Sequence, residues 1–174
     1  MRYSATVSDD PRRTVEQRWG DEAFNAQLRD IYWMASPEVR GHLNRRATGD
    51  RRVDWLTWLD HHVFRPRAEP LDFLVLGCGE GWLERALATS PSVRHVDAFD
   101  LSPEAVATAD RLAREQGLPI RYGVLDLNRD RLAPAAYDVV IAHSVLHHVA
   151  ELEHAYAEIA AALRPGGLLV LNEY

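Results

Sequence analysis

The stretch LVLGCGEGWLE carries glycine at every second position, a spacing that could bind a ligand. Gly77, Gly79 and Gly81, with Cys78 among them, follow an apolar run that predicts a buried strand over 71–77. Glycine permits positive φ and a close approach of the backbone, and the helical pattern after the loop offers free N–H groups. The loop is therefore a candidate binding site at the end of a strand.

Polar residues also end the next three apolar segments. Asp100 ends VRHVDAFD, Asp126 ends LPIRYGVLD with Leu127 behind it, and His143 ends YDVVIAH. Ligands of open α/β sheets bind beyond the carboxyl ends of the strands, so these residues and the glycine loop should meet. Asp100 can accept both hydroxyls of a ribose, while Asp126 and Leu127 can hold an exocyclic amine and a ring. Each residue alone also fits loop packing, a helix cap or a turn, but the set predicts an adenosine-containing ligand.

The elements that would position these residues alternate along the chain. The sequence predicts an α/β fold with a Rossmann-like, doubly wound and mostly parallel sheet in the order 3-2-1-4-5. Predicted strands cover 71–77, 93–100, 118–126, 137–143 and 168–174, and predicted helices cover 80–89, 102–117 and 147–163, with a turn over 164–167. Residues 71–174 would form the ligand-binding domain.

Residues 1–70 are predicted to form an N-terminal helical cap. Its helix start signals are Thr14, Ser36 followed by Pro37, and either Asp50 or Asp54. Tryptophans and aliphatic residues recur there at helical spacing, and packing among themselves is their first expected role. The cap could also close over the ligand as a lid, for which the candidates are Tyr32, Trp33, Arg40 and Asn44.

Composition excludes several classes of function. All twenty basic residues are arginine, so a P-loop lysine and a Schiff-base lysine are both missing. The net charge of −6 gives no general attraction to nucleic acid or to an anionic membrane. No apolar run reaches the ~18 residues of a membrane span, and the N-terminus lacks the apolar core of a secretory signal. Cys78 is the single cysteine and excludes an internal disulfide. We expect a cytoplasmic protein.

Trp82 distinguishes between adenosine-containing ligands. The dinucleotide fingerprint is G-x-G-x-x-G, whose third glycine lets the helix pack tightly on the strand. Here Trp82 occupies that position, and the third glycine comes one residue earlier. A tryptophan at this point argues against a pyrophosphate across the start of the helix.

From Leu71 to Tyr174 the chain resembles the class I S-adenosylmethionine-dependent methyltransferases, in LVLGCGEG, VDAFDLS, VLDLN, YDVVIAHSVLHHV and LRPGGLLVLNEY. YWMASPEVRGHLNRRATGD is similar to a bacterial subgroup of unassigned substrate. The resemblance implies that S-adenosylmethionine is the cofactor. It places Gly77, Cys78, Gly79 and Gly81 under the methionine and ribose, Asp100 at the ribose hydroxyls, Leu101 on the adenine, Asp126 and Leu127 at the adenine amine and ring, and His143 near the reacting methyl.

Two features depart from this family. Its members usually carry an acid two positions before the first glycine, which helps to hold the methionine amino group, and here that position is Val75. The family also continues beyond a fifth strand with two further strands. We therefore expect a chain truncated after strand five, or one that forms a homo-oligomer through the exposed edge of its sheet.

His143, His147 and His148 raise the question of a metal site. If a helix starts near His147, the spacing H-x3-H-H loses its meaning for a metal, and we expect none. His148 or His147 could instead act as a general base that takes a proton from the methyl acceptor. The alternative is that one of them caps or packs at the start of the helix.

The sequence therefore predicts a methyltransferase that transfers a methyl group from S-adenosylmethionine to an oxygen or nitrogen of a small molecule, with no membrane partner and no nucleic-acid substrate. A non-catalytic module that only binds S-adenosylmethionine is the first alternative. An NAD-dependent oxidoreductase is the second, and Trp82 and the missing lysines speak against it. The acceptor is not encoded in the cofactor motifs.

Overall fold

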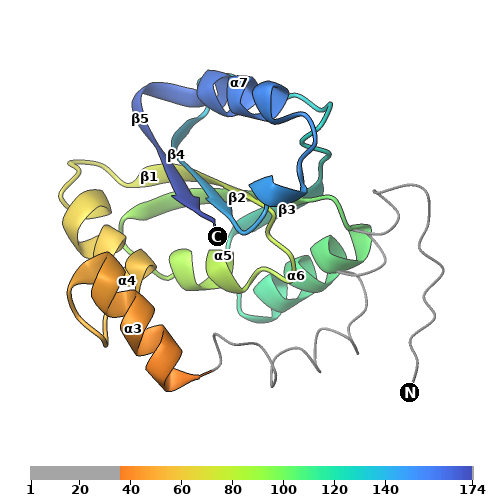
Figure 1. Cartoon of the computed structure of the whole chain (residues 1–174). Coiled ribbons are helices and arrows are strands. Elements are labelled where there is room, and N and C mark those ends of the chain that lie inside the picture. The colour runs from red at the N-terminus through yellow and green to blue at the C-terminus, as the bar shows by residue number, and fades with distance from the viewer. Residues whose placement is uncertain (1–35, 174) are drawn as a thin grey trace, which may run out of the picture.

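The computed structural model describes residues 36–173 and contains one five-stranded parallel sheet (Figure 1). The strands lie in the order β3-β2-β1-β4-β5, which confirms the predicted fold class. They are β1 (Leu71–Leu76), β2 (Val93–Asp100), β3 (Ile120–Val124), β4 (Tyr137–His143) and β5 (Leu163–Asn172). The helices are α3 (Pro37–Thr48), α4 (Trp55–Leu59), a π-helical turn (Asp60–Phe64), α5 (Trp82–Leu87), α6 (Pro103–Glu115), a 3₁₀ turn (Leu146–His148) and α7 (Leu152–Ala162).

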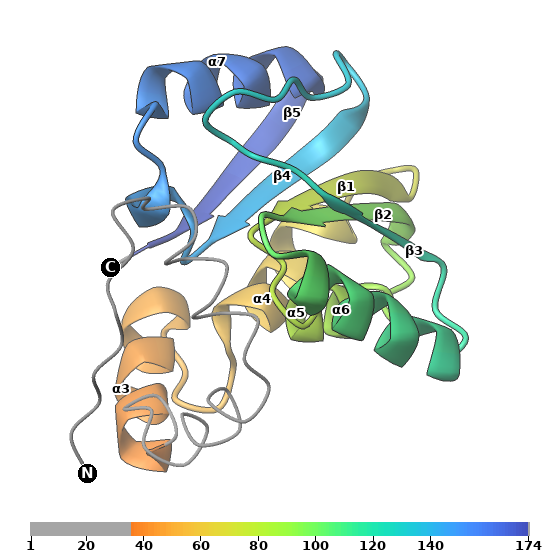
Figure 2. The ribbon, with the colours of Figure 1, turned by 90° about the vertical axis from the view of Figure 1, so that its right-hand side faces the viewer.

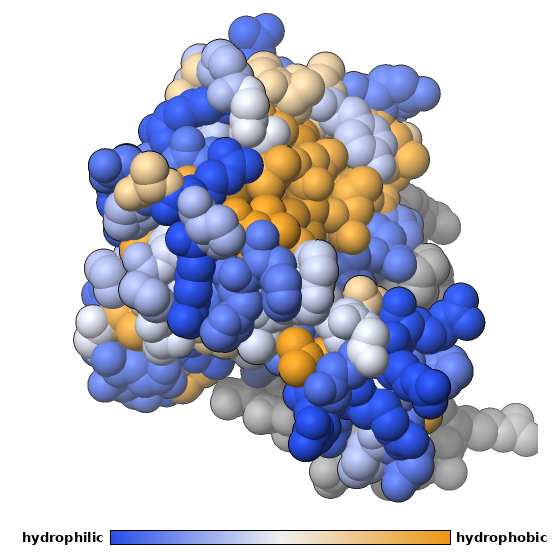
Figure 3. Space-filling view, turned by 90° about the vertical axis from the view of Figure 1, so that its left-hand side faces the viewer, coloured by the Kyte–Doolittle hydropathy of each residue, from blue (hydrophilic) through white to orange (hydrophobic). Residues whose placement is uncertain are grey.

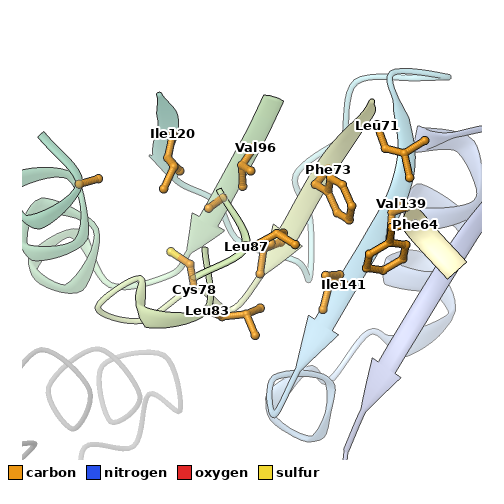
Figure 4. Packing of buried hydrophobic residues seen from close by; sticks show 13 residues of the cluster. Phe64, Leu71, Phe73, Cys78, Leu83, Leu87, Val96, Ile120, Val139 and Ile141 are labelled. Carbon is orange, nitrogen blue, oxygen red and sulfur yellow. The ribbon is translucent and has the colours of Figure 1, made fainter. Parts of the chain in front are cut away.

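Apolar side chains cover both faces of the sheet, as parallel strands require. Alternate residues of β1 point to opposite faces, so Phe73 and Val75 belong to one core cluster and Leu74 and Leu76 to the other. α4, the π-helical turn, α5 and α6 pack on the first face, whereas α7 packs on the second (Figures 1 and 2). Figure 4 shows the first cluster, with the side chains of α5 turned toward the strands.

Three helices start at a side chain that caps them. Ser36 caps α3 with Pro37 at its first position, Asp54 accepts from Thr57 N at the start of α4, and Ser102 accepts from Ala105 N at the start of α6. Of the two candidates for the second start, Asp54 is the cap. The helix predicted to start at Thr14 lies outside the described residues.

The predicted helix over 147–163 is wrong at its start. His147 and His148 lie in the 3₁₀ turn, and α7 begins only at Leu152. The turn before α7 is held by Asn128, whose Oδ1 accepts from Ala150 N at 2.8 Å and Glu151 N at 3.1 Å. This capping group comes from a different connection of the chain, so no local pattern marks the start.

Two strands also differ from their predicted limits. β3 ends at Val124, so Asp126 lies two residues beyond it. β5 begins at Leu163, inside the predicted helix, and includes the predicted turn as a register shift opposite the start of β4. Gly166 has φ 79° in that irregular part, which is a conformation that glycine adopts without strain.

The amino ends of the strands are tied together by charged residues. Arg164 of β5 donates from Nη1 to Asp72 of β1 and Asp138 of β4, both at 2.8 Å, and Arg94 of β2 contacts Asp72 at 3.3 Å. Asp138 also accepts from the Asp72 N–H at 2.9 Å. One cluster of side chains thus joins four neighbouring strands at the end opposite the glycine loop.

β5 is an edge strand and pairs only with β4 among the described residues. Leu168, Leu169 and Val170 are partly exposed there, and Leu171 is 46% exposed. Figure 3 shows apolar side chains gathered on the side of the molecule that carries this strand. An apolar edge of this kind is open to pairing with a further strand.

Candidate cofactor-binding site

The glycine loop connects β1 to α5 and has three left-handed residues. Gly77, Gly79 and Gly81 have φ of 73°, 50° and 75°. A Cβ at Gly77 would collide with Val145, and a Cβ at Gly81 would lie 2.5 Å from Tyr122 Oη, whereas a Cβ at Gly79 would meet nothing within 4 Å. Packing thus accounts for two of the glycines, and Gly79 alone faces open space.

Asp100 joins the end of β2 to this loop. Its Oδ2 accepts from the Gly79 N–H at 2.8 Å, and its Oδ1 accepts from the Ser102 N–H at 2.9 Å. Each carboxylate oxygen has two lone pairs, so each can accept one further hydrogen bond. Leu101, directly after Asp100, is partly exposed at the same edge of the sheet. The structure therefore brings Asp100 and the open glycine together, as predicted.

Asp126 and Leu127 lie in the connection after β3, and both are buried, at 4% and 9% exposure. The Asp126 carboxylate accepts from the Asn128 N–H at 3.1 Å and from its Nδ2 at 2.9 Å, and it pairs with Arg129 Nε at 3.1 Å. Asp126 also donates its own N–H to Asp130 at 2.8 Å. It is thus a turn residue in this structure, whether or not it also meets a ligand.

His143, at the end of β4, lies between two tryptophans. Its ring centroid is 5.8 Å from that of Trp55 in α4 and 5.6 Å from that of Trp82 at the start of α5. Burial lowers the pKa of His143, with the nearby Glu173 carboxylate acting in the opposite direction, so the ring is neutral near pH 7. Its Nδ1 is buried and has no hydrogen-bond partner in the described part of the chain.

His147 is oriented by Glu173, which follows β5. Glu173 Oε2 lies 2.8 Å from His147 Nδ1, and Oε1 accepts from the Val145 and Leu146 N–H groups at 2.9 Å each. Burial acts to raise the pKa of Glu173, but these hydrogen bonds outweigh it and leave the pKa lowered, so the carboxylate is charged. The His148 ring lies against His147, with centroids 3.9 Å apart. Sequence reasoning missed Glu173, which directly follows β5.

No metal site is found within residues 36–173, since no three His, Cys, Asp or Glu side chains are grouped to hold an ion. Cys78 is 5% exposed, and burial raises the pKa of its thiol far above the usual range, so it is a small packed side chain.

Val75 and Glu84 were not predicted to be related, but they lie on the same side of the sheet. Val75 is 1% exposed and belongs to the apolar cluster on which α5 packs. Glu84 is in the first turn of α5 and is 0% exposed, and neither of its carboxyl oxygens has a hydrogen-bond partner among the described residues. Burial raises the pKa of Glu84 to about 8. An acid in the first turn of a helix ordinarily interacts with the helix dipole, so its sequence position gave no signal of this environment.

The candidate lid residues are only partly described. Tyr32 and Trp33 lie outside the described residues. Asn44 donates from Nδ2 to the Arg51 carbonyl at 3.2 Å, which is a contact within the helical segment. Trp55, which was not among these candidates, contacts the end of β4 through the ring of His143. The two surface hollows of the helical segment include none of the predicted site residues.

No helix among residues 36–173 is both long and apolar enough to cross a membrane.

The methyltransferase domain family matches residues 74–171 of the chain. The ubiquinone biosynthesis O-methyltransferase of Burkholderia pseudomallei (strain 1710b) is 33% identical over 115 residues, which are 64% of this chain and 47% of that protein. The malonyl-[acyl-carrier protein] O-methyltransferase of Hahella chejuensis (strain KCTC 2396) is 32% identical over 103 residues, or 59% and 36% of the two chains.

Among solved structures, an S-adenosylmethionine-dependent methyltransferase from Mesorhizobium loti matches with a TM-score of 0.57 and 27% identity, over 67% of this chain and 52% of that one. The chain thus spans about half the length of the first of the curated relatives it matches and of this structure. The family match covers the glycine loop, all three strand-end positions and the His147 turn. The chain therefore belongs to the methyltransferase domain family, and its cofactor is S-adenosylmethionine.

Proposed function

We propose that residues 71–173 bind S-adenosylmethionine at the glycine loop and that the protein transfers its methyl group to an oxygen or nitrogen of a small molecule. The observation that carries this proposal is the Asp100 carboxylate, which is hydrogen-bonded to Gly79, the glycine of the loop that faces open space. A ribose at that place can donate both hydroxyls to the remaining lone pairs of Asp100. The backbone around Gly79 then lies against the ligand with no side chain between them.

The residues present fit this cofactor. The open space over Gly79, the unpartnered Nδ1 of His143 and the unpartnered carboxyl of Glu84 are all near the ends of the same central strands. Leu101 offers an apolar contact for the adenine, while Asp126 and Leu127 stand at the next strand end. S-adenosylmethionine, when bound, supplies a methyl group that is activated by a positively charged sulfur.

The acceptor side of the site is formed by His143, the two tryptophans and the His147 turn. Methyl transfer is an in-line displacement, for which alignment of the two reactants contributes most. Trp55, Trp82 and the neutral His143 form aromatic surfaces that can limit how an acceptor lies. His147 can take the proton of the acceptor as its general base, because Glu173 contacts its Nδ1 and orients the ring. His148 is the second candidate.

The names of the relatives favour oxygen over nitrogen as the atom methylated. Both curated relatives described above are O-methyltransferases. A hydroxyl that is already acidic, or a carboxyl, needs less help from a base than an aliphatic hydroxyl does. We therefore propose an O-methyltransferase whose acceptor carries a phenol-like hydroxyl or a carboxyl group.

The proposal is tested by calorimetry with S-adenosylhomocysteine on the wild type and on Asp100→Asn. Asp100→Asn removes a charged acceptor for two ribose hydroxyls, which should cost about 2 kcal/mol of binding free energy. The dissociation constant should therefore rise by about 30-fold. Asp110→Asn, the same change on the outer surface of α6, is the matched control and should leave the affinity unchanged. Equal affinity in wild type and Asp100→Asn would contradict the proposed site.

A module that binds the cofactor without catalysis is the alternative. The observation behind it is the partly exposed apolar edge of β5, which pairs only with β4 among the described residues. Binding of S-adenosylmethionine without methyl transfer to phenols, carboxylic acids or amines would support the module. Tighter binding of NAD than of S-adenosylhomocysteine would contradict both.

A further inference from the structure

Glu84 is the one described acid whose two carboxyl oxygens are fully buried without a partner. It lies at the third position of α5, directly after the glycine loop, and its neighbours Leu83 and Leu87 pack into the apolar core. A carboxyl placed so ordinarily costs stability, and a leucine of similar size would pack better. A bound ligand that interacts with this carboxyl would offset the cost of burying it.

The groups coupled to Glu84 belong to the glycine loop and to strands β2 and β3. Asp100 at the end of β2 and Cys78 in the loop are electrostatically coupled to it, and so is Tyr122 of β3. Arg85 is the only described cation coupled to Glu84, but its Nη1 donates to the Glu80 carbonyl at 2.6 Å. Asp100 is thus hydrogen-bonded to the glycine loop and Glu84 follows the loop by three residues, and neither acid forms an ion pair in the described part of the chain.

Such a site suits a ligand that brings positive charge. S-adenosylmethionine carries a sulfonium, whereas S-adenosylhomocysteine has lost that charge and is otherwise the same molecule. Both share the amino group, the carboxylate and the adenosine. A carboxyl that is neutral in the empty site can ionise when a fixed positive charge comes near, and it becomes neutral again when the charge leaves.

We propose that Glu84 makes the site selective for charge: it releases its proton when the sulfonium cofactor binds and regains one once the methyl group has been transferred. This inference rests on the proposed cofactor site at the glycine loop. Its consequence is that the product is held less tightly than the cofactor, because the charge that stabilised the Glu84 carboxylate has gone. The proton balance is one proton released to solvent on binding and one taken up after transfer. Glu84 acts through the field at the loop and is a positioning residue, not the base for the acceptor.

The test is calorimetry at pH 7 in two buffers with different ionisation enthalpies, which gives the number of protons released per ligand bound. For the wild type we expect close to one proton with S-adenosylmethionine and with sinefungin, whose amine replaces the sulfonium charge, and clearly fewer with S-adenosylhomocysteine. Comparison among these ligands cancels the titration of their shared amino group. Glu84→Gln should release no extra proton for the cationic ligands.

The variant should also bind S-adenosylmethionine about tenfold more weakly while its affinity for S-adenosylhomocysteine changes less than about threefold. Glu115→Gln, an exposed glutamate of α6, is the matched control and should behave as the wild type. If Glu84→Gln does not fold, the wild type alone still decides, through its proton release and the pH dependence of the affinity ratio of the two ligands.

Three results have distinct meanings. Proton release limited to the cationic ligands and abolished in Glu84→Gln supports the inference. Normal binding of both ligands with equal proton release would overturn the inference but leave the proposed cofactor site intact. Failure of both ligands to bind the wild type would overturn the cofactor site and this inference together.

Discussion

Replacement of Glu84 by glutamine should change how the stability of the protein depends on pH, even in the absence of any ligand. Burial raises the pKa of this carboxyl in the folded state from 4.5 to about 8. In the unfolded chain the group ionises near its ordinary value. The folded protein therefore holds a proton between those two pH values that the unfolded chain has lost.

The sign follows from that difference. Because the folded state binds more protons, the free energy of unfolding of the wild type falls as the pH rises from about 4.5 to about 8. Below pH 4.5 the carboxyl is protonated in both states. Above pH 8 it is ionised in both states, and the whole decrease in unfolding free energy has occurred. At about 1.4 kcal/mol per pKa unit the whole change is about 5 kcal/mol, and between pH 5 and pH 7 it is about 3 kcal/mol. These are upper bounds, because water that enters near the carboxyl would reduce them.

The measurement is urea unfolding, followed by circular dichroism, at steps between pH 5 and pH 8.5. Glutamine keeps the size of the side chain and cannot ionise, so the variant should lose this part of the pH dependence. The quantity to compare is the difference in unfolding free energy between Glu84→Gln and the wild type, which should rise by about 3 kcal/mol from pH 5 to pH 7. A constant cost of burying the amide cancels from that slope.

Glu115→Gln is the control, since it makes the same chemical change on the exposed side of α6. Its difference from the wild type should stay within about 0.5 kcal/mol at every pH. If the difference for Glu84→Gln is equally flat, the carboxyl is solvated or paired in solution, and the reasoning that places an unpartnered acid under the loop is refuted.

Three further predictions concern the loop, the base and the opposite end of the sheet. Gly81→Ala should lower the unfolding free energy by about 2–4 kcal/mol, because the added Cβ meets Tyr122 at a residue with positive φ. Gly79→Ala should lower it by only about 1 kcal/mol and yet weaken S-adenosylhomocysteine binding at least tenfold. Similar thermal stability of the two variants would contradict this prediction. His147→Asn should lower the rate of methyl transfer by about 10²-fold or more with an unchanged calorimetric affinity for the cofactor, and an unchanged rate would remove His147 as the base. Arg164→Gln should reduce the unfolding free energy by about 1–2 kcal/mol with no effect on cofactor affinity, and an altered affinity would show that the two ends of the sheet are coupled.

The fold could be predicted from the sequence because it depends on local patterns that agree with one another. The apolar runs that became β1, β2 and β4 are short and bounded, and Ser36, Asp54 and Ser102 cap their helices with their own side chains. The start of α7 could not be predicted in this way. Its preceding turn is held by Asn128, which is distant in sequence and has no local relation to the helix.

The strand-end rule found most of the candidate site and explains what was missed. It led to Asp100 and His143 because polar residues stand out after apolar strands. It did not lead to Glu173, because the predicted strand over 168–174 included that residue, whereas β5 ends at Asn172. Glu84 follows no such rule. Its burial depends on how closely α5 approaches the sheet, which is a property of tertiary packing.

The charged cluster of Asp72, Arg94, Asp138 and Arg164 separates two roles along each strand, alignment of the sheet at the amino end and the proposed cofactor site at the carboxyl end. Each of the four is the second residue of its strand, where it helps to align the sheet, while residues at the far ends form the proposed cofactor site. Substitutions at the glycine-loop end can therefore accumulate without disturbing strand alignment, since the charged cluster fixes that alignment at the opposite end of the strands. For a protein engineer this means that acceptor preference and stability can be selected in separate libraries, one for each end of the same five strands.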